Sequence, residues 1–364
     1  MMPTINQHIV NSRLSVPSIE EERKIYPSVL SARMGKLMIS VYRKVGTVLS
    51  FLVLILSVSP LPQTAAFQVR EFPISISVSY PRDPAPSADG AVYFVAMNSD
   101  LVVRMDPTTK SFRSYNLPEG SQPHGIVADR DGNLWITAMG GNRISRLNPK
   151  TGDLSSYPIP SPGNGPHTPV LDPQDNLWFT MQRSGKIGKV ERRTGKVTEY
   201  PIPTRGSGPY GIAVDQGGTV WFAELSGHKV GRLDPATGKI TEYAPPTRRS
   251  GPRRVAIGPD GTVWFTQYRR GGLGKLDPAT GKITEYPPVS GPDSGPYAIA
   301  VDGQGRIVYN EISANTVIRF DPRTERFETL ALPSANTAIR KMAADAGGRV
   351  WFVGSSSKTI GWLE

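Results

Sequence analysis

Short runs of apolar and aromatic residues alternate with turn residues along most of this chain, and the whole pattern returns every 42 to 44 residues. The clearest copy, residues 208–246, reads GPYGIAVDQGGTVWFAELSGHKVGRLDPATGKITEYAPP. Seven copies follow one another up to the C-terminus. A pattern that repeats at this period is typical of an array of small units, none of which can bury its apolar face alone.

Each copy predicts four short strands. In residues 208–246 they are expected at GIAV, VWFA, KVGRL and KITEY, which are rich in β-branched and aromatic residues. The segments between them, such as Gly217-Gly218 and DPATGK, tolerate a positive φ or set φ with proline, as tight turns require. The fourth strand ends at a proline, which has no backbone N–H and therefore suits the outer edge of a sheet.

The two ends of the array predict how it closes. Four strands per repeat are compatible with a propeller or with a linear stack of sheets. The last copy stops after its third strand, and the missing fourth strand stands at the other end, where VREFPI (69–74) matches VTEYPI (197–202). We therefore predict an all-β fold, a seven-bladed β-propeller over residues 67–364, in which the N-terminal strand completes the C-terminal blade.

The first 66 residues lack the repeat. Residues 1–33 are polar and irregular, and are expected to be a leader that translation from Met34 or Met38 would omit. In residues 34–66, basic residues precede an apolar run at 45–59 and small residues follow at 64–66, which predicts a signal peptide cleaved near Ala66. The predicted location is secreted or periplasmic. An uncleaved signal anchor is the alternative, although the run is shorter than the ~20 residues of a spanning helix.

Composition narrows the choice of partners. The chain has no cysteine, which excludes disulfides and thiol chemistry. Its net charge is +11, but the basic residues recur at turns all round the ring, as at Lys186, Lys229 and Lys282, and do not cluster with aromatic residues. This pattern argues against nucleic acid as a partner. We expect a monomer with a small-molecule ligand, which touches a membrane only through an uncleaved anchor.

The start of each blade's first strand carries the candidate site. In a propeller these positions crowd round one mouth of the central channel, a usual place for a ligand. Small residues would be enough for a structural ring, yet all seven positions hold large hydrogen-bond donors. They are Arg82, His124, His167, Tyr210, Arg253, Tyr297 and Arg340. We call them the anchors and predict that they bind a ligand; a merely solvated rim is the alternative.

A second ring lies 14 residues after the anchors, at the end of each second strand. It reads Ala96, Ala138, Met181, Glu224, Gln267, Glu311 and Gly354. Its small and apolar members predict that the histidine side of the mouth is open. Glu224 and Glu311 are candidates for binding a ligand or holding Arg253, and structural pairing is the alternative.

Two of the four histidines, His124 and His167, occupy neighbouring anchors. A neutral imidazole can take a proton from a substrate near pH 7, so these residues are the candidate catalytic pair. The alternative is that both only donate hydrogen bonds at the rim. Residues 129–133 (DRDGN) look like the start of a calcium loop but lack its terminal Glu, so we interpret them as a hairpin turn.

The repeat GPYGIAVD…VWFAE…KVGRLDPATGKITEY resembles that of the streptogramin lyase (virginiamycin B lyase) family over residues 67–364. The resemblance implies a seven-bladed propeller and a lyase that linearises cyclic depsipeptide antibiotics by elimination, with magnesium. A histidine base removes the proton α to the ester carbonyl and the ester oxygen leaves. By the match, His167 would be that base, while His124 and Tyr210 would contact substrate. Two glutamates that the family ties to the metal fall here on Gly165 and Met181, so the cofactor stays open.

Three functions are compatible with these features. The first is an exported lyase-like enzyme that acts on an ester or lactone at His124 and His167. The second is a non-catalytic propeller that binds an anionic small molecule through Arg82, Arg253 and Arg340, since guanidinium groups pair bidentately with carboxylates. The third is a protein-interaction platform.

Overall fold

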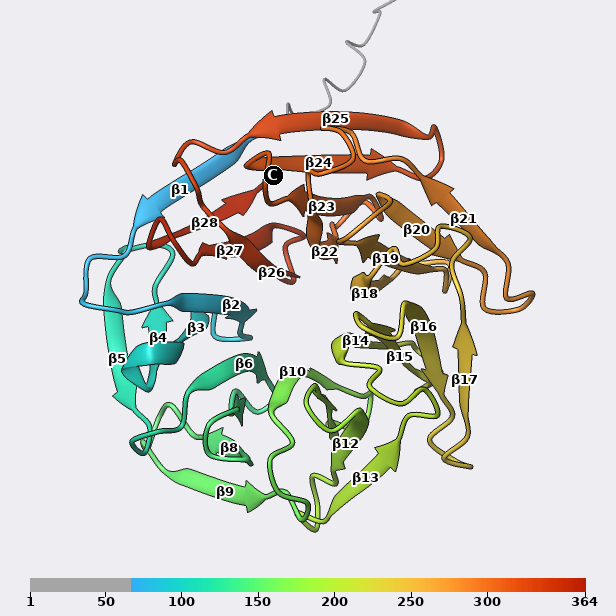
Figure 1. Ribbon diagram of the computed structural model, residues 1–364. Helices are drawn as coiled ribbons and strands as arrows, with labels where there is room; N and C mark the ends of the chain where they lie inside the picture. Colours follow the sequence, from blue (N-terminus) through green and yellow to red (C-terminus); the bar gives the residue numbers. More distant parts are fainter. Residues whose placement is uncertain (1–66) are drawn as a thin grey trace, which may run out of the picture. The chain divides into compact units, whose positions relative to one another are not determined.

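The computed structural model describes residues 67–364, so the leader, signal-peptide and start-site predictions lie outside the described residues. Residues 67–364 form seven four-stranded antiparallel sheets, arranged as blades around a central axis (Figure 1). The single helix among them is a short 3-10 turn, η1 (Met97–Ser99). The predicted seven-bladed propeller is confirmed. None of the described helices is long and apolar enough to cross a membrane.

The blades follow the chain from the inner strand outwards. Blade 1 is β2 (Pro81–Pro86), β3 (Val92–Ala96), β4 (Leu101–Met105) and β5 (Phe112–Asn116), and blade 2 is β6 (Pro123–Ala128), β7 (Leu134–Ala138), β8 (Arg143–Leu147) and β9 (Leu154–Pro158). Blade 3 is β10 (Pro166–Leu171), β11 (Leu177–Met181), β12 (Lys186–Val190) and β13 (Val197–Pro201), and blade 4 is β14 (Pro209–Val214), β15 (Val220–Glu224), β16 (Lys229–Leu233) and β17 (Ile240–Tyr243). Blade 5 is β18 (Pro252–Ile257), β19 (Val263–Gln267), β20 (Leu273–Leu276) and β21 (Ile283–Tyr286), and blade 6 is β22 (Pro296–Val301), β23 (Ile307–Glu311), β24 (Thr316–Asp321) and β25 (Arg326–Ala331). Blade 7 is β26 (Ile339–Ala344), β27 (Val350–Gly354) and β28 (Thr359–Leu363), completed by β1 (Val69–Pro73).

A tryptophan in the second strand fixes the turn that precedes it. In blade 2 the indole Nε1 of Trp135 donates to Asp129 at 3.1 Å, and the other oxygen of that carboxylate accepts the backbone N–H of Asn133 at 2.8 Å. The same indole-to-carboxylate bond recurs at Trp178, Trp221 and Trp351. A buried indole needs a partner for its N–H. One carboxylate both accepts that N–H and shapes the hairpin turn. The carboxylate at 129 thus serves a hairpin turn, as expected.

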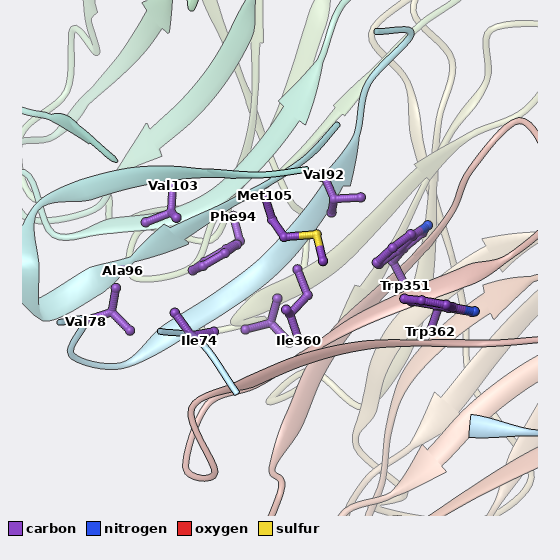
Figure 2. Packing of buried hydrophobic residues seen from close by; sticks show 11 residues of the cluster. Ile74, Val78, Val92, Phe94, Ala96, Val103, Met105, Trp351, Ile360 and Trp362 are labelled. Atoms are coloured by element: carbon purple, nitrogen blue, oxygen red, sulfur yellow. The ribbon is translucent and has the colours of Figure 1, made fainter. Parts of the chain in front are cut away.

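The N-terminal strand closes the ring as predicted. β1 pairs antiparallel with β28, from Val69 opposite Leu363 to Pro73 opposite Thr359. The carboxylate of Glu71 accepts the backbone N–H of Ser334 at 3.1 Å and the hydroxyl of Thr359. Figure 2 shows the apolar side of this closure, where Ile74 and residues of blade 1 pack with Ile360 and Trp362 of the last blade.

Candidate functional site

A β-bulge in the first strand of each blade lies at or beside the anchor. In blade 4, Pro209 pairs with Glu224 and Ile212 pairs with Phe222, so Tyr210 and Gly211 together oppose the single residue Ala223. The pairing shifts in the same region of every first strand. A bulge bends the strand and re-aims the side chains at that point. In blades 3 to 7 the ladder thus releases the anchor and the residue after it. In blade 2 it releases His124 alone, and in blade 1 it releases Asp83 and Pro84 while Arg82 stays paired with Val95.

Buried threonines in the second strands hold these bulges in place. The hydroxyl of Thr137 accepts the backbone N–H of Gly125 at 2.9 Å and donates to the carbonyl oxygen of His167, one blade further, at 2.7 Å. Thr180 and Thr266 bond the carbonyl oxygens of Tyr210 and Tyr297 in the same way. These positioning residues escaped the sequence analysis. The signal was the recurring threonine of LWIT, LWFT and VWFT, one position before the second ring.

The two histidines form a buried pair whose rings are in contact and tilted by 38°. Their ring centroids are 3.5 Å apart, and the ring of Tyr210 lies 4.0 Å from that of His167. His124 is 3% exposed and His167 is 1% exposed. The prediction that the histidine side of the mouth is open is therefore wrong. The large aromatic anchors pack on one another there.

Burial lowers the pKa of both imidazoles well below the usual 6.5. For His124 the next cause is the positive charge of Arg82, and for His167 it is that of Arg254. Both effects disfavour a second proton on the ring. Both histidines are therefore neutral at pH 7, as a proton acceptor must be.

Hydrogen bonds give the two neutral rings different tautomers. Nδ1 of His124 lies 3.1 Å from the carbonyl oxygen of His167, which can only accept, so Nδ1 carries the proton and Nε2 has a free lone pair. Nδ1 of His167 lies 2.9 Å from the hydroxyl of Thr168, which already accepts from Arg254 Nη1 at 2.8 Å. We assign this hydroxyl as the donor to Nδ1, which places the proton of His167 on Nε2. The pair thus presents one acceptor and one donor.

The remaining anchors at this mouth form an arginine–tyrosine cluster. The guanidinium of Arg253 donates to the hydroxyl of Tyr210 at 3.0 Å and to that of Tyr297 at 2.6 Å, and it lies 3.7 Å from the ring centroid of Tyr297. Arg340 donates to Tyr297 at 3.3 Å, and the two tyrosine hydroxyls bond each other. Burial raises the pKa of Tyr297, but the charges of Arg253, Arg254 and Arg340 outweigh it and bring the pKa to about 8. The structure therefore brings six of the seven anchors into contact.

Arg82 makes no hydrogen bond to the other six anchors, all of which the structure describes. Its guanidinium contacts the thioether of Met97 at 3.6 Å and the carboxylate of Asp83 at 3.4 Å. Asp83, Arg254 and Lys341 each follow an anchor and contribute charges that the sequence analysis missed. The corresponding residues in other blades are small, as at Gly125, Gly211 and Ala298, so the pattern gave no signal beyond the Arg253-Arg254 pair.

The second-ring carboxylates do not join the anchors among the described residues. Glu311 is buried and accepts the backbone N–H groups of Val289 and Ser290 at 2.8 and 2.7 Å, which is structural pairing. Glu224 is also buried, and neither of its oxygens has a hydrogen-bond partner. Burial, followed by the negative charge of Glu242, raises the pKa of Glu224 to about 8.

The Glu224→Gln variant is expected to be more stable than the parent at pH 8 and nearly unchanged at pH 5. Because the folded-state pKa of about 8 exceeds the ordinary 4.5, the folded state binds the extra proton between these values, and stability falls as pH rises from 4.5 to 8. Glutamine does not titrate, so the gain at pH 8 should be about 2–4 kcal/mol. Gln267 occupies the same position in blade 5, which shows that an amide fits there.

Urea unfolding at the two pH values measures this difference. The matched control is Gln267→Glu, which should lose stability at pH 8 by a similar amount. A gain for Glu224→Gln that is equal at pH 5 and pH 8 would contradict the assignment.

The residues at the implied magnesium position do not fit that ion. Magnesium prefers carboxylate and water oxygens. Gly165 has no side chain and packs against Arg183, whose Cγ would lie 3.0 Å from a Cβ at that position, and Met181 is part of the apolar core. Within residues 67–364, no group of three or more His, Cys, Asp or Glu side chains is placed to hold a metal.

The fold and this site define a seven-bladed β-propeller with imidazoles, phenols and guanidinium groups converging at one end of its channel. The chain belongs to the virginiamycin B lyase family, whose sequence profile matches residues 63–287 and 111–364. The resemblance inferred from the sequence is confirmed. The comparison with curated proteins gives no match.

Solved structures agree with this assignment. A streptogramin B lyase is 28% identical, with a TM-score of 0.76 over 82% of this chain and 97% of its own. Virginiamycin B lyase from Staphylococcus aureus is 26% identical, with a TM-score of 0.75 over 82% of this chain and 99% of its own. A catalytically inactive variant of that enzyme, solved with quinupristin, is also 26% identical, with a TM-score of 0.74 and the same coverage.

Proposed function

We propose that this protein is an exported lyase that opens an ester or lactone by elimination at the mouth formed by the anchors. The observation that carries the proposal is the contact between two buried, neutral imidazoles, which we assign as one proton acceptor and one hydrogen-bond donor. A base and an acid so close together can act on the same substrate, and each contributes typically 10²–10⁴-fold to the rate of a reaction.

In this mechanism Nε2 of His124 removes a proton from the carbon next to a carbonyl. The electron pair forms a carbon–carbon double bond, the carbon–oxygen bond on the neighbouring carbon breaks, and the oxygen leaves as a carboxylate. Nε2–H of His167 donates to the carbonyl oxygen as negative charge develops there. Arg253 and Arg340 pair with the departing carboxylate. These roles exchange the ones that the family resemblance implies for His124 and His167.

Quinupristin and a linear O-acyl threonine amide test the reaction with one cyclic and one open substrate. Elimination converts the cyclic substrate to a linear isomer of the same mass, whereas hydrolysis adds a water, and mass spectrometry separates the two results. If neither substrate is consumed, the proposal is contradicted. Cell fractionation tests export, which predicts a mature protein that begins near Phe67.

Removal of magnesium is expected to leave this activity unchanged, because Gly165 and Met181 offer no carboxylate to the ion. The rate is measured after dialysis against a chelator and again after magnesium is added back. Strong inhibition that magnesium reverses would show that other residues, such as Glu224 or Glu311, supply metal ligands.

A second function is capture of an anionic small molecule without chemistry. The observation that favours it is the partial exposure of Arg253 and Arg340, whose guanidinium groups meet only phenol hydroxyls and aromatic rings at the mouth. Binding of a small carboxylate, such as the acid that elimination would release from the open ester, without turnover of either ester would select this function over the lyase.

A further inference from the structure

Two long cationic side chains cross the central channel behind the anchors. Arg254 of blade 5 donates to the carbonyl oxygen of Arg340 in blade 7 at 3.0 Å and to Thr168 in blade 3, and it lies 3.6 Å from the carboxylate of Asp83 in blade 1. Lys341 of blade 7 donates to the carbonyl oxygen of Ile126 in blade 2 at 3.0 Å. These side chains form the floor of the channel beneath the mouth.

The floor carries more positive charge than its one carboxylate can balance. Arg82 and Arg254 both face Asp83, at 3.4 and 3.6 Å, and Lys341 is close enough for the same carboxylate to act on its charge. Arg82 is 3% exposed and Arg254 is 4% exposed. Even so, Nη2 of Arg82 is buried without a hydrogen-bond partner. Nη2 of Arg254 and Oδ2 of Asp83 face each other at 3.6 Å and are also buried without one. A buried guanidinium N–H without a hydrogen-bond acceptor is costly. The site therefore has room for one more negatively charged acceptor.

We propose that the channel floor binds one small monovalent anion, a halide or a carboxylate. Nη2 of Arg82 and Nη2 of Arg254 donate to it, and the ammonium of Lys341 contributes a third donor. Asp83 competes with the anion for the same guanidinium groups. This site lies next to the histidine pair, to which Arg254 is connected through Thr168, but it does not depend on the proposed lyase activity.

The state of Lys341 agrees with this inference. Burial lowers the pKa of Lys341 to about 8, with Asp83 opposing the shift and the two arginines adding to it. Lys341 is therefore largely charged at pH 7 and becomes neutral as pH rises through about 8. Anion affinity should accordingly fall between pH 7 and pH 9.

Chloride is the first probe and formate is the second. ³⁵Cl NMR line broadening reports chloride binding directly, and thermal unfolding in sodium chloride, sodium formate or sodium gluconate at one ionic strength reports stabilisation by a bound ion. Gluconate serves as the anion too large for the site. Saturable stabilisation by chloride or by formate supports the site, and the pair distinguishes a spherical ion from a planar carboxylate.

Two variants shift the affinity in opposite directions. Lys341→Ala removes a donor and should weaken binding about tenfold or more, since a hydrogen bond to a charged group is worth about 1.5–3 kcal/mol. Alanine already stands at the corresponding position of blade 6, so the change suits the fold. Asp83→Asn removes the competing carboxylate and should tighten binding. Lys282→Ala, which removes an exposed cation on a turn, should change nothing.

The alternative is that these charges only hold the channel closed. In that case chloride and formate would stabilise the protein no more than gluconate does, or their effect would be the same in Lys341→Ala, Asp83→Asn and Lys282→Ala. Either result would overturn the proposal. Because line broadening is measured on folded protein, a variant with lowered stability still gives a reading.

Discussion

Deletion of residues 67–75 is expected to abolish the folded propeller. The deletion removes β1, which supplies the whole outer edge of blade 7, and with it Ile74 of the cluster between the first and last blades. β28 would then expose an unpaired row of backbone groups, which invites aggregation through the open edge. Soluble yield and the melting temperature measure the result.

Two controls separate the loss of the β1–β28 pairing from the effects of a shorter N-terminus and of a missing surface ion pair. A truncation that ends before Phe67 keeps β1 and should melt like the mature protein. Arg70→Ala breaks the 2.9 Å ion pair with Glu364 at the surface and should cost about 1 kcal/mol or less, because exposed ion pairs contribute little. A soluble protein that lacks residues 67–75 and melts at the original temperature would refute the pairing.

The fold was predictable because the same pattern of strands and turns occurs in all seven copies of the repeat. The pattern of Val220, Trp221 and Phe222 followed by Gly231 requires strands in a fixed register, since a Cβ at 231 would lie 2.1 Å from the ring of Phe222. Each of these contacts lies within one copy. The closing strand was predictable for the same reason, because VREFPI carries the pattern of an outer strand.

For the site, the sequence could identify only the residues that stand at a fixed position of the repeat. Position in the repeat identified the anchors, and the structure brings six of them together. Position in the repeat could not reveal that Arg254 extends across the channel to three other blades. Nor could it reveal that the aromatic anchors pack against the histidine pair. Arg254 lies 86 positions from both Arg340 and Thr168, and His124 lies 43 positions from His167, so no single copy of the repeat contains both partners of these contacts.

The same substitution at the two histidines is expected to have unequal effects on turnover. In His124→Gln the amide cannot take a proton, so kcat should fall by about 10²–10⁴-fold with the Michaelis constant little changed, because a base acts mainly in the transition state. In His167→Gln the amide N–H can still donate to the carbonyl oxygen, so kcat should fall only about tenfold, the worth of a weakened hydrogen bond.

Thr168→Val and the pH profile test the tautomers that underlie this difference. Without the hydroxyl, His167 loses the group that keeps its proton on Nε2, so kcat should fall while substrate binding persists. The low pKa of both rings, caused first by burial, predicts a rate that is level from pH 7 down through 6.5 and declines only in more acidic solution, where His124 gains a proton. If His167→Gln abolished turnover while His124→Gln retained it, the roles would be those implied by the family. Thr168 would then accept a hydrogen bond from Nδ1–H of His167, which leaves Nε2 of His167 as the base, while His124 would contact substrate.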